Sequence, residues 1–580
     1  MFKTNYIFPI ATVILLFLFF LGIPDLGKTR LRKTTGKLLT KADIILMATI
    51  TLIFGVVDFI GLGNTTSPET FEYMPDKTVY IEFSSPQAVN NILLFPGVGE
   101  GYYNVDYSED GVDYYNFLEF YQHYNTVLKW QNCSPAFYTT AKYYRIYASG
   151  NVYLGELAFS DANGNLISYT ASGSDRLNDE QSKVCFDENF MNSSYFDEIY
   201  HARTAWENLN GVYPYEISHP PLGKIILSLG ILLFGMTPFG WRFSGTMIGV
   251  LMLPVLYVFA KRMFASTRAA ACTALIFATD FMHFVQTRIA TIDSYAVFFI
   301  ILMYMFMFGF VSTGSRKSLA LSGVFFGLGA ASKWTCIYAG AGLALIWVVY
   351  WIINRKAGIK VFLKNALFCL LFFVLVPVLI YMLSYIPYAK ALQISVFSLD
   401  YLKEIINNQQ FMFSYHSNLV ATHPYSSVWY QWIFDIRPIL YYLKYYTDGT
   451  RQSFGAFMNP ILCWGGLISL FLLIYYAVVK RCRTALFIII GYLAQLVPWM
   501  FVTRLTFEYH YFPCGVFLAL ALGYVISIME NGSKHYKPYI YSLTALSVLL
   551  FIFFYPTLSG KPVDNATASK LYSWLSTWPF

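Results

Sequence analysis

Long apolar segments separated by short polar connectors recur along this chain of 580 residues. An apolar segment of about 20 residues is long enough to cross a bilayer as a helix. The pattern predicts about twelve membrane-spanning helices, which begin near residues 6, 43, 244, 268, 291, 318, 335, 361, 456, 484, 511 and 538. The chain is therefore predicted to be a polytopic α-helical membrane protein.

Lysine and arginine are concentrated in every second connector, which indicates the cytoplasmic side of the membrane. The first such connector runs from Lys28 to Lys41, and the later ones contain Lys261/Arg262/Arg268, Arg316/Lys317, Arg355/Lys356/Lys360, Lys480/Arg481/Arg483 and Lys534/Lys537. With these connectors inside, residues 63–243 and 387–455 are the two long segments predicted to lie outside. No small-residue cleavage site follows the first apolar segment, so we expect it to be a retained helix and not a signal peptide.

Part of the first outer segment has a different pattern. Over residues 66–170, short alternating or aromatic-rich runs are separated by turn residues such as SSPQ, PGVGEG, EDG and ANGN. Short strands with this even punctuation are typical of an antiparallel β-sandwich. The expected architecture is thus a helical membrane protein with an inserted extracytoplasmic β-sandwich.

The insert resembles the discoidin-like, galactose-binding jelly-roll family over about 95 residues. The resemblance rests on IEFSSPQ, YNVDYSEDG and YYRIY. It implies a sugar-binding or protein-binding module in which loop-tip tyrosines stack on a ligand, although ordinary packing explains them equally well. The candidate tyrosines are Tyr102, Tyr103, Tyr114 and Tyr115. Cys133 and Cys185 are candidates for a disulfide in an oxidising compartment, but the sequence does not show that they meet.

Composition and charge narrow the class further. The chain is 56% hydrophobic and only 13% charged, which excludes an ordinary cytosolic protein. Its net charge of +7 divides into −14 over residues 65–220, with 21 acidic and 7 basic side chains, and +21 elsewhere. Because the basic residues are dispersed between apolar segments, nucleic-acid binding is not expected.

Polar residues recur at the predicted outer ends of the spans. Charges at membrane depth are costly and usually face a cavity or a partner. They predict a functional cavity on the outer face, although any single residue could instead extend to the lipid headgroups. The set comprises Asp280, Arg288, Asp293, Lys333, Arg437, Arg504, Glu508 and His510.

The candidate chemistry lies where the insert ends. The motif FDE at residues 196–198 precedes an amphipathic segment, and HPPLGK follows at residues 219–224. The apolar run 222–238 is too short for a span and is predicted to be an interfacial helix. The expected parts are two N-terminal spans, the sandwich, an outer catalytic loop and a transmembrane body, over residues 1–63, 66–170, 171–243 and 244–580.

Nine motifs in a fixed order resemble the GT-C membrane glycosyltransferases of the protein O-mannosyltransferase type. They are FDE, HPPLGK, WRFSG, TRIATID, GLGAASKW, HPYSSVWYQW, RPILYY, NPILCWGG and GYLAQLVPWMFVTRLTFEYHYFP. In that family an LG-x-P helix end runs directly into FDE. Here Leu62-Gly63-Asn64 and Phe196-Asp197-Glu198 are identified as the two halves, separated by the insert.

The resemblance implies transfer, with inversion, of a sugar from a polyprenyl phosphate carrier to a hydroxyl at the outer membrane face. Asp197 corresponds to the family's catalytic base and Glu198 to its neighbour, which orients acceptor or base. Cations must surround the leaving phosphate. We expect its ligands to be a subset of six residues, among which Arg242 and His219 match the motifs best: His219, Lys224, Arg242, Arg288, Lys333 and Arg504.

Further residues are expected to support this site. Asp293 is predicted to pair with Arg288, and Glu216 is a candidate second carboxylate, although the family often places it where Ile217 stands. Asn459 and the Trp429/Trp432 pair are expected to shape the cavity, or simply to pack. His423 and His510 complete the supporting set. No metal-ligand spacing occurs, so no metal or other cofactor is indicated, although a carboxylate-bound divalent ion at Asp197/Glu198 stays open.

The expected reaction is transfer of mannose to Ser/Thr hydroxyls of exported proteins, and the expected location is a bacterial plasma membrane. Other functions are weighed against it. A transporter should show internal repeats and broken helices, which the sequence lacks. A sugar-sensing receptor needs a cytoplasmic output domain, for which the inner connectors are too short. The runner-up is a related GT-C transferase that glycosylates a cell-envelope glycan or lipid.

Overall fold

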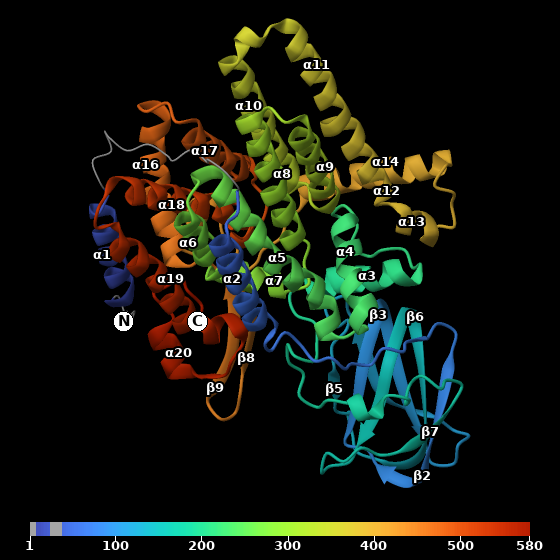
Figure 1. Ribbon diagram of the computed structural model, residues 1–580. Coiled ribbons are helices and arrows are strands. Elements are labelled where there is room, and N and C mark those ends of the chain that lie inside the picture. Colours follow the sequence, from blue (N-terminus) through green and yellow to red (C-terminus); the bar gives the residue numbers. More distant parts are fainter. Residues whose placement is uncertain (1–6, 24–37) are drawn as a thin grey trace. The chain divides into compact units, whose positions relative to one another are not determined.

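The computed structural model describes residues 7–23 and 38–580 (Figure 1). Most of the predicted basic connector from Lys28 onward, residues 28–37, lies outside the described residues. The chain divides into two compact units. The helical unit comprises Met1–Ile60, Glu216–Ile226 and Gly245–Phe580, and the sandwich unit comprises Gly61–Tyr215 and Leu227–Ser244.

Helices build nearly all of the helical unit, and two of them, α4 (Leu222–Phe234) and α5 (Pro238–Phe264), continue from one unit into the other. The others are α1 (Ile7–Leu21), α2 (Lys41–Phe59), α6 (Thr267–Ala278), α7 (Phe281–Arg288), α8 (Asp293–Thr313), α9 (Arg316–Ser332), α10 (Thr335–Ile353), α11 (Ile359–Leu370), α12 (Val376–Leu383), α13 (Ile386–Ala391), α14 (Leu399–Asn418), α15 (Trp429–Trp432), α16 (Gly466–Val478), α17 (Arg483–Leu496), α18 (Phe512–Gly532), α19 (Tyr536–Ser559) and α20 (Asn565–Leu571).

The polytopic membrane fold is confirmed. Within the described residues, nine helices are long and apolar enough to cross a bilayer, or ten if α6 and α7, bent by 56°, form one span. The count of about twelve is not confirmed, because α1 has only 15 residues and α9 only 17. The span that ends in α18 is wholly buried, whereas the span of α11–α13 is almost entirely exposed. The first therefore forms the centre of the bundle and the second its periphery.

Local signals explain where several helices begin and end. Helix α2 starts in a capping box, in which Thr40 Oγ1 accepts from the Asp43 amide and Asp43 Oδ2 accepts from the Thr40 amide. Asp43 also forms a buried ion pair with Lys261 of α5 at 3.0 Å. Helix α8 ends at Gly314, whose φ of 72° is readily available only to glycine.

A small sheet closes the helical unit. It has the order β10-β9-β8, with β8 (Ile439–Tyr445), β9 (Thr450–Ala456) and β10 (Val563–Asp564) all antiparallel. The first two strands fall in the predicted outer loop 387–455, where the sequence analysis expected no strands. Pairing of Val563 with Arg451 ties the segment after α19 to this hairpin.

The sandwich unit contains a seven-stranded antiparallel assembly with the path β4-β3-β6-β2-β7. Its strands are β1 (Glu72–Tyr73), β2 (Thr78–Ala88), β3 (Asn91–Ser108), β4 (Tyr115–Gln122), β5 (Gln131–Cys133), β6 (Thr140–Ser160) and β7 (Tyr169–Ser172). Along β2, Val79, Ile81 and Phe83 are buried while Tyr80 and Glu82 are exposed, as the period of two requires. The β-sheet insert is confirmed, whereas its discoidin-like identity stays a prediction.

Side-chain positions correct two details of the insert. Tyr103 lies in β3 and is fully buried, with its hydroxyl donating to Gln122 Oε1 at 2.7 Å, so it cannot stack on a ligand. Tyr102 and Tyr115 are exposed. Cys133 and Cys185 are both free thiols and do not pair. Burial raises the pKa of Cys133 to about 11, which keeps this thiol protonated and unreactive.

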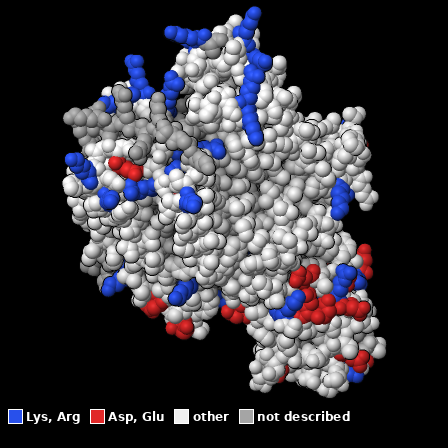
Figure 2. Space-filling view, in the orientation of Figure 1, with Lys and Arg blue, Asp and Glu red and all other residues white. Residues whose placement is uncertain are grey.

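The regional division of charge is visible on the surface. Figure 2 shows acidic side chains gathered on the sandwich unit, and lysine and arginine side chains projecting from the helical unit near the turn between α10 and α11. Arg355, Lys356 and Lys360 belong to this turn. The excess of acidic residues thus belongs to the sandwich unit, and the excess of basic residues belongs to the helical unit.

Candidate functional site

Two buried residues of the predicted site form a closed ion pair in the sandwich unit. Glu198 begins helix α3 (Glu198–Asn210), and Arg242 lies near the start of α5; both side chains are almost completely buried. Arg242 Nε donates to Glu198 Oε1 at 2.7 Å, and Nη2 donates to Oε2 at 2.8 Å. Trp241 Nε1 and the Tyr195 amide also donate to Glu198 Oε2. Because the charges of both side chains are neutralised and hydrogen-bonded within the protein, this ion pair stabilises the fold.

The same guanidinium also forms hydrogen bonds with the chain before the insert and after it. Arg242 Nη1 donates to the carbonyls of Leu62 and Phe190 at 2.8 and 2.6 Å, and Nη2 donates to that of Ser193 at 3.0 Å. A Cβ on Gly63 would lie 2.9 Å from Nη1, so this close approach requires glycine. All five N–H donors of Arg242 are therefore used by protein acceptors. In this arrangement no donor of Arg242 is left for a phosphate, so its role as a phosphate ligand stays a prediction.

Asp197 is placed differently from its neighbour. It is half-buried at the N-cap position of α3, and its carboxylate does not cap the helix. The preceding residue, Phe196, has a φ of 47°, an uncommon conformation for a bulky side chain. Asp197 is thus partly exposed just after this turn, whereas Glu198 is fully buried. Asp197 stays a predicted base, while Glu198 is committed to Arg242.

In the helical unit, the motif HPPLGK forms a second closed group. Lys224 is fully buried, and its Nζ donates to Glu216 Oε2 at 2.5 Å and to the carbonyls of Glu216 and His219 at 2.6 and 2.9 Å. These three bonds use every donor of the ammonium group. No donor of Lys224 is thus left for a phosphate in this arrangement, and its role as a phosphate ligand stays a prediction. Glu216, the candidate second carboxylate, instead neutralises Lys224 and holds His219 Nδ1 at 3.0 Å.

Lys333 and Arg504 differ from these two cations. Lys333 Nζ donates to Asp293 Oδ1 at 2.7 Å and lies 5.5 Å from the ring centre of Tyr509. Arg504 Nη1 donates to the Leu505 carbonyl at 3.3 Å. Among the described residues no other hydrogen bond engages either group, so two ammonium donors and four guanidinium donors stay available. Lys333 and Arg504 thus keep donors with which they can receive an anion.

Histidines surround these cations. His416 of α14, which the sequence analysis missed, has its ring 5.2 Å from that of His219, and its Nε2 lies 2.8 Å from the Ser218 carbonyl. Burial and the nearby charges of Lys333 and Arg504 lower the pKa of His416 to about 4. Burial also lowers the pKa of His219, although Glu216 opposes this. Both rings are therefore neutral at pH 7, and each has a single N–H. His416 donates it from Nε2 to the Ser218 carbonyl, and His219 donates it from Nδ1 to Glu216.

One predicted pairing is wrong. Asp293 pairs with Lys333 instead of Arg288. Arg288 donates to the main-chain carbonyls of Asp58 and Ile60 at the end of α2, and its guanidinium lies 4.8 Å from the ring centre of Phe284. Orphan carbonyls at a helix C-terminus attract such a cation. Arg288 thus connects α7 to α2, and Asp293 aligns Lys333.

The remaining supporting residues have structural partners. Asn459 is fully buried, accepts from the Ile461 amide and donates to the carbonyls of Thr279 and Ser547, which favours the packing role. His510 lies beside Trp432 and Trp499, with ring centres 6.0 and 4.3 Å away. His423 Nδ1 accepts from the Tyr425 amide at 3.2 Å. Its imidazole ring lies against Phe507, with ring centres 5.0 Å apart.

A buried carboxyl in the loop before β8 was not singled out from the sequence. Asp435 is fully buried with a φ of 57°, and its Oδ1 accepts from the Met458 amide at 3.1 Å. Burial raises the pKa of Asp435, whose carboxyl group lies near that of the buried Glu508. One aspartate in a loop that contains both polar and apolar residues does not indicate burial. Sequence reasoning could therefore not have identified Asp435.

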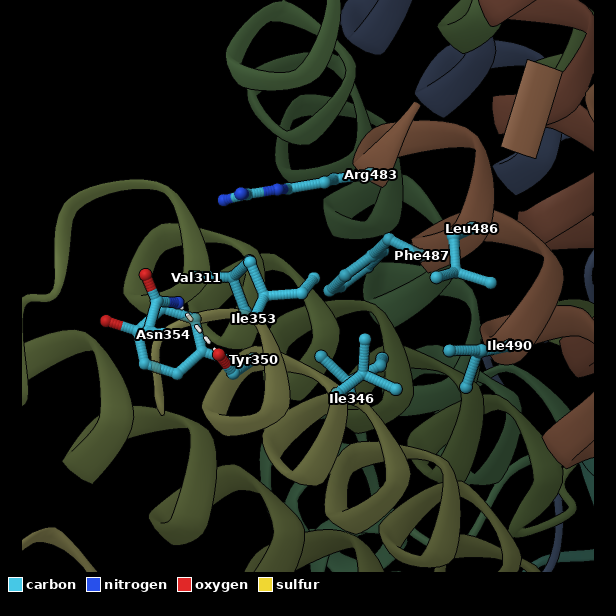
Figure 3. A pocket seen from close by; sticks show the side chains of 10 residues that line it. Val311, Ile346, Tyr350, Ile353, Asn354, Arg483, Leu486, Phe487 and Ile490 are labelled. Carbon is cyan, nitrogen blue, oxygen red and sulfur yellow. Dashed lines mark hydrogen bonds between the residues drawn. The ribbon is translucent and has the colours of Figure 1, made fainter. Parts of the chain in front are cut away.

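Two other features lie apart from these groups. The carboxylates of Glu156, Asp179 and Glu180 approach within 4.8 Å of one another in the sandwich, but they accept from the amides of Glu69, Thr70 and Glu180 and from the side chain of Gln181. A mainly apolar groove lies between α10 and α17 and contains Tyr350 and Phe487 (Figure 3). It is at the opposite end of α10 from Lys333, roughly 25 Å away at 1.5 Å per residue.

Family comparisons cover most of the helical unit. Residues 218–381 match the family described as dolichyl-phosphate-mannose-protein mannosyltransferase. Residues 401–578 match the C-terminal four-transmembrane region of protein O-mannosyltransferase. Neither matched range includes the β-sandwich. The two matches follow one another along the chain, in the order that the sequence motifs predicted.

Individual proteins give the same picture. A polyprenol-phosphate-mannose–protein mannosyltransferase from Mycolicibacterium smegmatis is 25% identical over 458 residues, covering 66% of this chain and 87% of its own. The Mycobacterium tuberculosis protein of the same name is 24% identical, covering 66% and 86%. The Saccharomyces cerevisiae protein O-mannosyltransferase Pmt1-Pmt2 complex bound to the sugar donor has a TM-score of 0.59 at 15% identity, covering 67% of this chain and 89% of that chain. This last likeness supports the fold.

Proposed function

Because this chain belongs to the protein O-mannosyltransferase family, we propose that it transfers mannose from a polyprenyl phosphate carrier to Ser or Thr hydroxyls of exported proteins. The relatives that share most of the chain carry this activity in their names. The observation that carries the proposal is the pair of available cations, Lys333 and Arg504, among neutral histidines. Such donors suit a phosphate whose negative charge grows as it leaves.

Asp197 is the proposed base. Its carboxylate takes the proton of the acceptor hydroxyl while the hydroxyl oxygen attacks the anomeric carbon from the side opposite the phosphate. The bond between the anomeric carbon and the phosphate oxygen breaks, the anomeric configuration inverts, and polyprenyl phosphate leaves with one further negative charge. Lys333 and Arg504 are proposed to hold that phosphate, with the neutral rings of His219 and His416 beside them.

Location and orientation are part of the proposal. The basic connectors are proposed to face the cytoplasm of a bacterial plasma membrane, with the donor phosphate bound at the outer face. Lys333 and Lys356 flank α10, so the cation proposed to bind the phosphate and the basic turn after α10 lie at opposite ends of this helix. No metal is needed in this scheme, because protein cations supply the positive charge.

A defined transfer assay tests the function. The purified full chain in nanodiscs receives polyprenyl-phosphate mannose and a peptide rich in Ser and Thr, with a matched peptide that carries Ala at those positions. We expect a mass increase of one hexose on the Ser/Thr peptide alone. Transfer to a lipid or glycan acceptor, with no peptide product, would favour a GT-C transferase of the cell envelope and overturn the protein acceptor.

A further inference from the structure

Helix α14 has three sides with three kinds of side chain. The side buried in the helical unit carries Tyr401, Ile405, Asn408 and Met412. A second side is polar and exposed, and carries Asp400, Lys403, Asn407, Gln410 and Ser414. The third side is apolar and exposed, and carries Leu399, Leu402, Ile406 and Phe413. At about 100° per residue, the centre of the apolar side lies roughly 120° from that of the buried side and roughly 90° from that of the polar side.

The apolar exposed side is pronounced. Leu399 is 73% exposed, Ile406 55% and Phe413 68%. Phe397 before the helix and Val420 after it are each 96% exposed. Exposure of such a row of apolar side chains to water is unfavourable. The row therefore indicates that something covers it.

The apolar surface continues from a helix that faces lipid. The span formed by α11–α13 is almost entirely exposed, with Val378, Leu379 and Leu383 on its outside. Exposed apolar residues then continue through Leu392 to Phe397, two residues before α14 begins. In Figure 1, α14 runs across the direction of α8, α9 and α10. A helix across the direction of the spans, joined to a lipid-facing one, is placed to lie along the membrane surface.

We propose that α14 is a bilayer-surface helix whose row Leu399, Leu402, Ile406 and Phe413 is buried among lipid acyl chains. Its polar side then faces water, with Lys403 beside the headgroups, as in other interfacial amphipathic helices. The occupant is lipid because the row continues the lipid-facing surface of α12.

This placement has a consequence that rests on the proposed function. The buried side of α14 holds the segment that leads to His219: Asn408 Nδ2 donates to the Ile217 carbonyl at 2.9 Å, and His416 Nε2 lies 2.8 Å from that of Ser218. A helix seated at headgroup depth therefore sets these histidines at the depth where the phosphate of a lipid-linked donor lies. The location of the helix itself does not depend on the reaction.

Fluorescence quenching in a bilayer tests the proposal without turnover. A small fluorescent amino acid is introduced singly at Leu402, Ile406 or Phe413 of the full chain, and at the matched positions Lys403, Asn407 and Gln410. Each variant is placed in phosphatidylcholine/phosphatidylglycerol nanodiscs, with lipid labelled at carbon 5 by a doxyl group or with aqueous iodide. We expect doxyl lipid to quench the first group at least threefold more than the second, and iodide to show the reverse order.

Two results would overturn the proposal. Iodide quenching of the apolar row equal to that of the matched positions would mean that the row faces water. Protection of the row from both quenchers would mean that protein covers it, either a second copy of the chain or another subunit. Neither result bears on whether mannose is transferred, so failure here is distinct from failure of the proposed function.

Discussion

Two groups of cations in this protein have the same chemistry but opposite availability. Arg242 in the sandwich unit uses all five of its N–H donors on Glu198 and on three carbonyls. Arg504 in the helical unit gives a single hydrogen bond to the Leu505 carbonyl among the described residues. The contrast shows that a charged residue in a family motif can serve architecture or ligand binding. Counting its donors distinguishes the two roles.

The largest expected effect concerns the neighbours Asp197 and Glu198. Asp197→Asn should lower turnover by roughly 100- to 10,000-fold, because the acceptor proton loses its base. The melting temperature should stay close to that of the wild type. The assay is transfer of labelled mannose to a peptide, with melting followed in parallel. Wild-type turnover in this variant would contradict the assignment of the base.

Arg242→Met tests the closed group. The substitution leaves Glu198 buried without its cation and should cost about 3–5 kcal/mol of stability. We expect poor yield and a strongly lowered melting temperature in detergent. The double variant Glu198→Gln/Arg242→Met should recover part of the loss, because no buried charge is left unpaired. A stable single variant with weakened donor binding would instead return Arg242 to the phosphate site.

Arg504→Gln tests the open group. Loss of a charged donor to phosphate should weaken binding of the lipid-linked donor by about 10- to 100-fold, from about 1.5–3 kcal/mol per charged hydrogen bond. Stability should change little, because no buried carboxylate depends on this residue. The measurement is KM for the donor together with the melting temperature. Arg437→Gln, in the same outer region, is the matched control and should keep the wild-type KM.

The smallest effect concerns Glu156, a buried carboxylate served by amide donors instead of a cation. Burial raises the pKa of Glu156 to about 8 in the folded protein, against 4.5 for an ordinary glutamate. Between about pH 4.5 and pH 8 the folded state therefore binds more protons than the unfolded state, and stability falls as pH rises. We expect the sandwich to melt a few degrees lower at pH 8 than at pH 5, and Glu156→Gln to reduce this difference. An unchanged slope would contradict the raised pKa.

The sequence predicted the elements well because their signals are local. Apolar segments predicted the membrane helices, and period-two runs between turn residues predicted the strands of the sandwich. Adjacent residues of a strand point to opposite faces of the sheet. This alternation accounts for the burial of Tyr103 and the exposure of its neighbour Tyr102.

The partners of the site residues could not be predicted from sequence. Motifs give the residue types, but the acceptors of Lys224 and Arg242 are mostly main-chain carbonyls, which every residue possesses. His416 escaped notice because it lies on an amphipathic helix outside the recognised motifs. Both Arg288 and Lys333 were candidate partners of Asp293, and only the fold shows that Lys333 forms the ion pair.

The clasp made by Arg242 also bears on how such proteins change over evolution. One guanidinium holds Leu62 before the sandwich and Phe190 and Ser193 after it, and the Asn64 amide bonds to the Met191 carbonyl at 2.7 Å. Entry and exit of the insert are therefore fixed side by side, whatever lies between them. Such a junction accepts a domain gained, lost or exchanged as one genetic unit, provided that its ends are close together. The connection between Leu62 and Phe190 can thus exchange its domain while the residues of the helical unit keep their places.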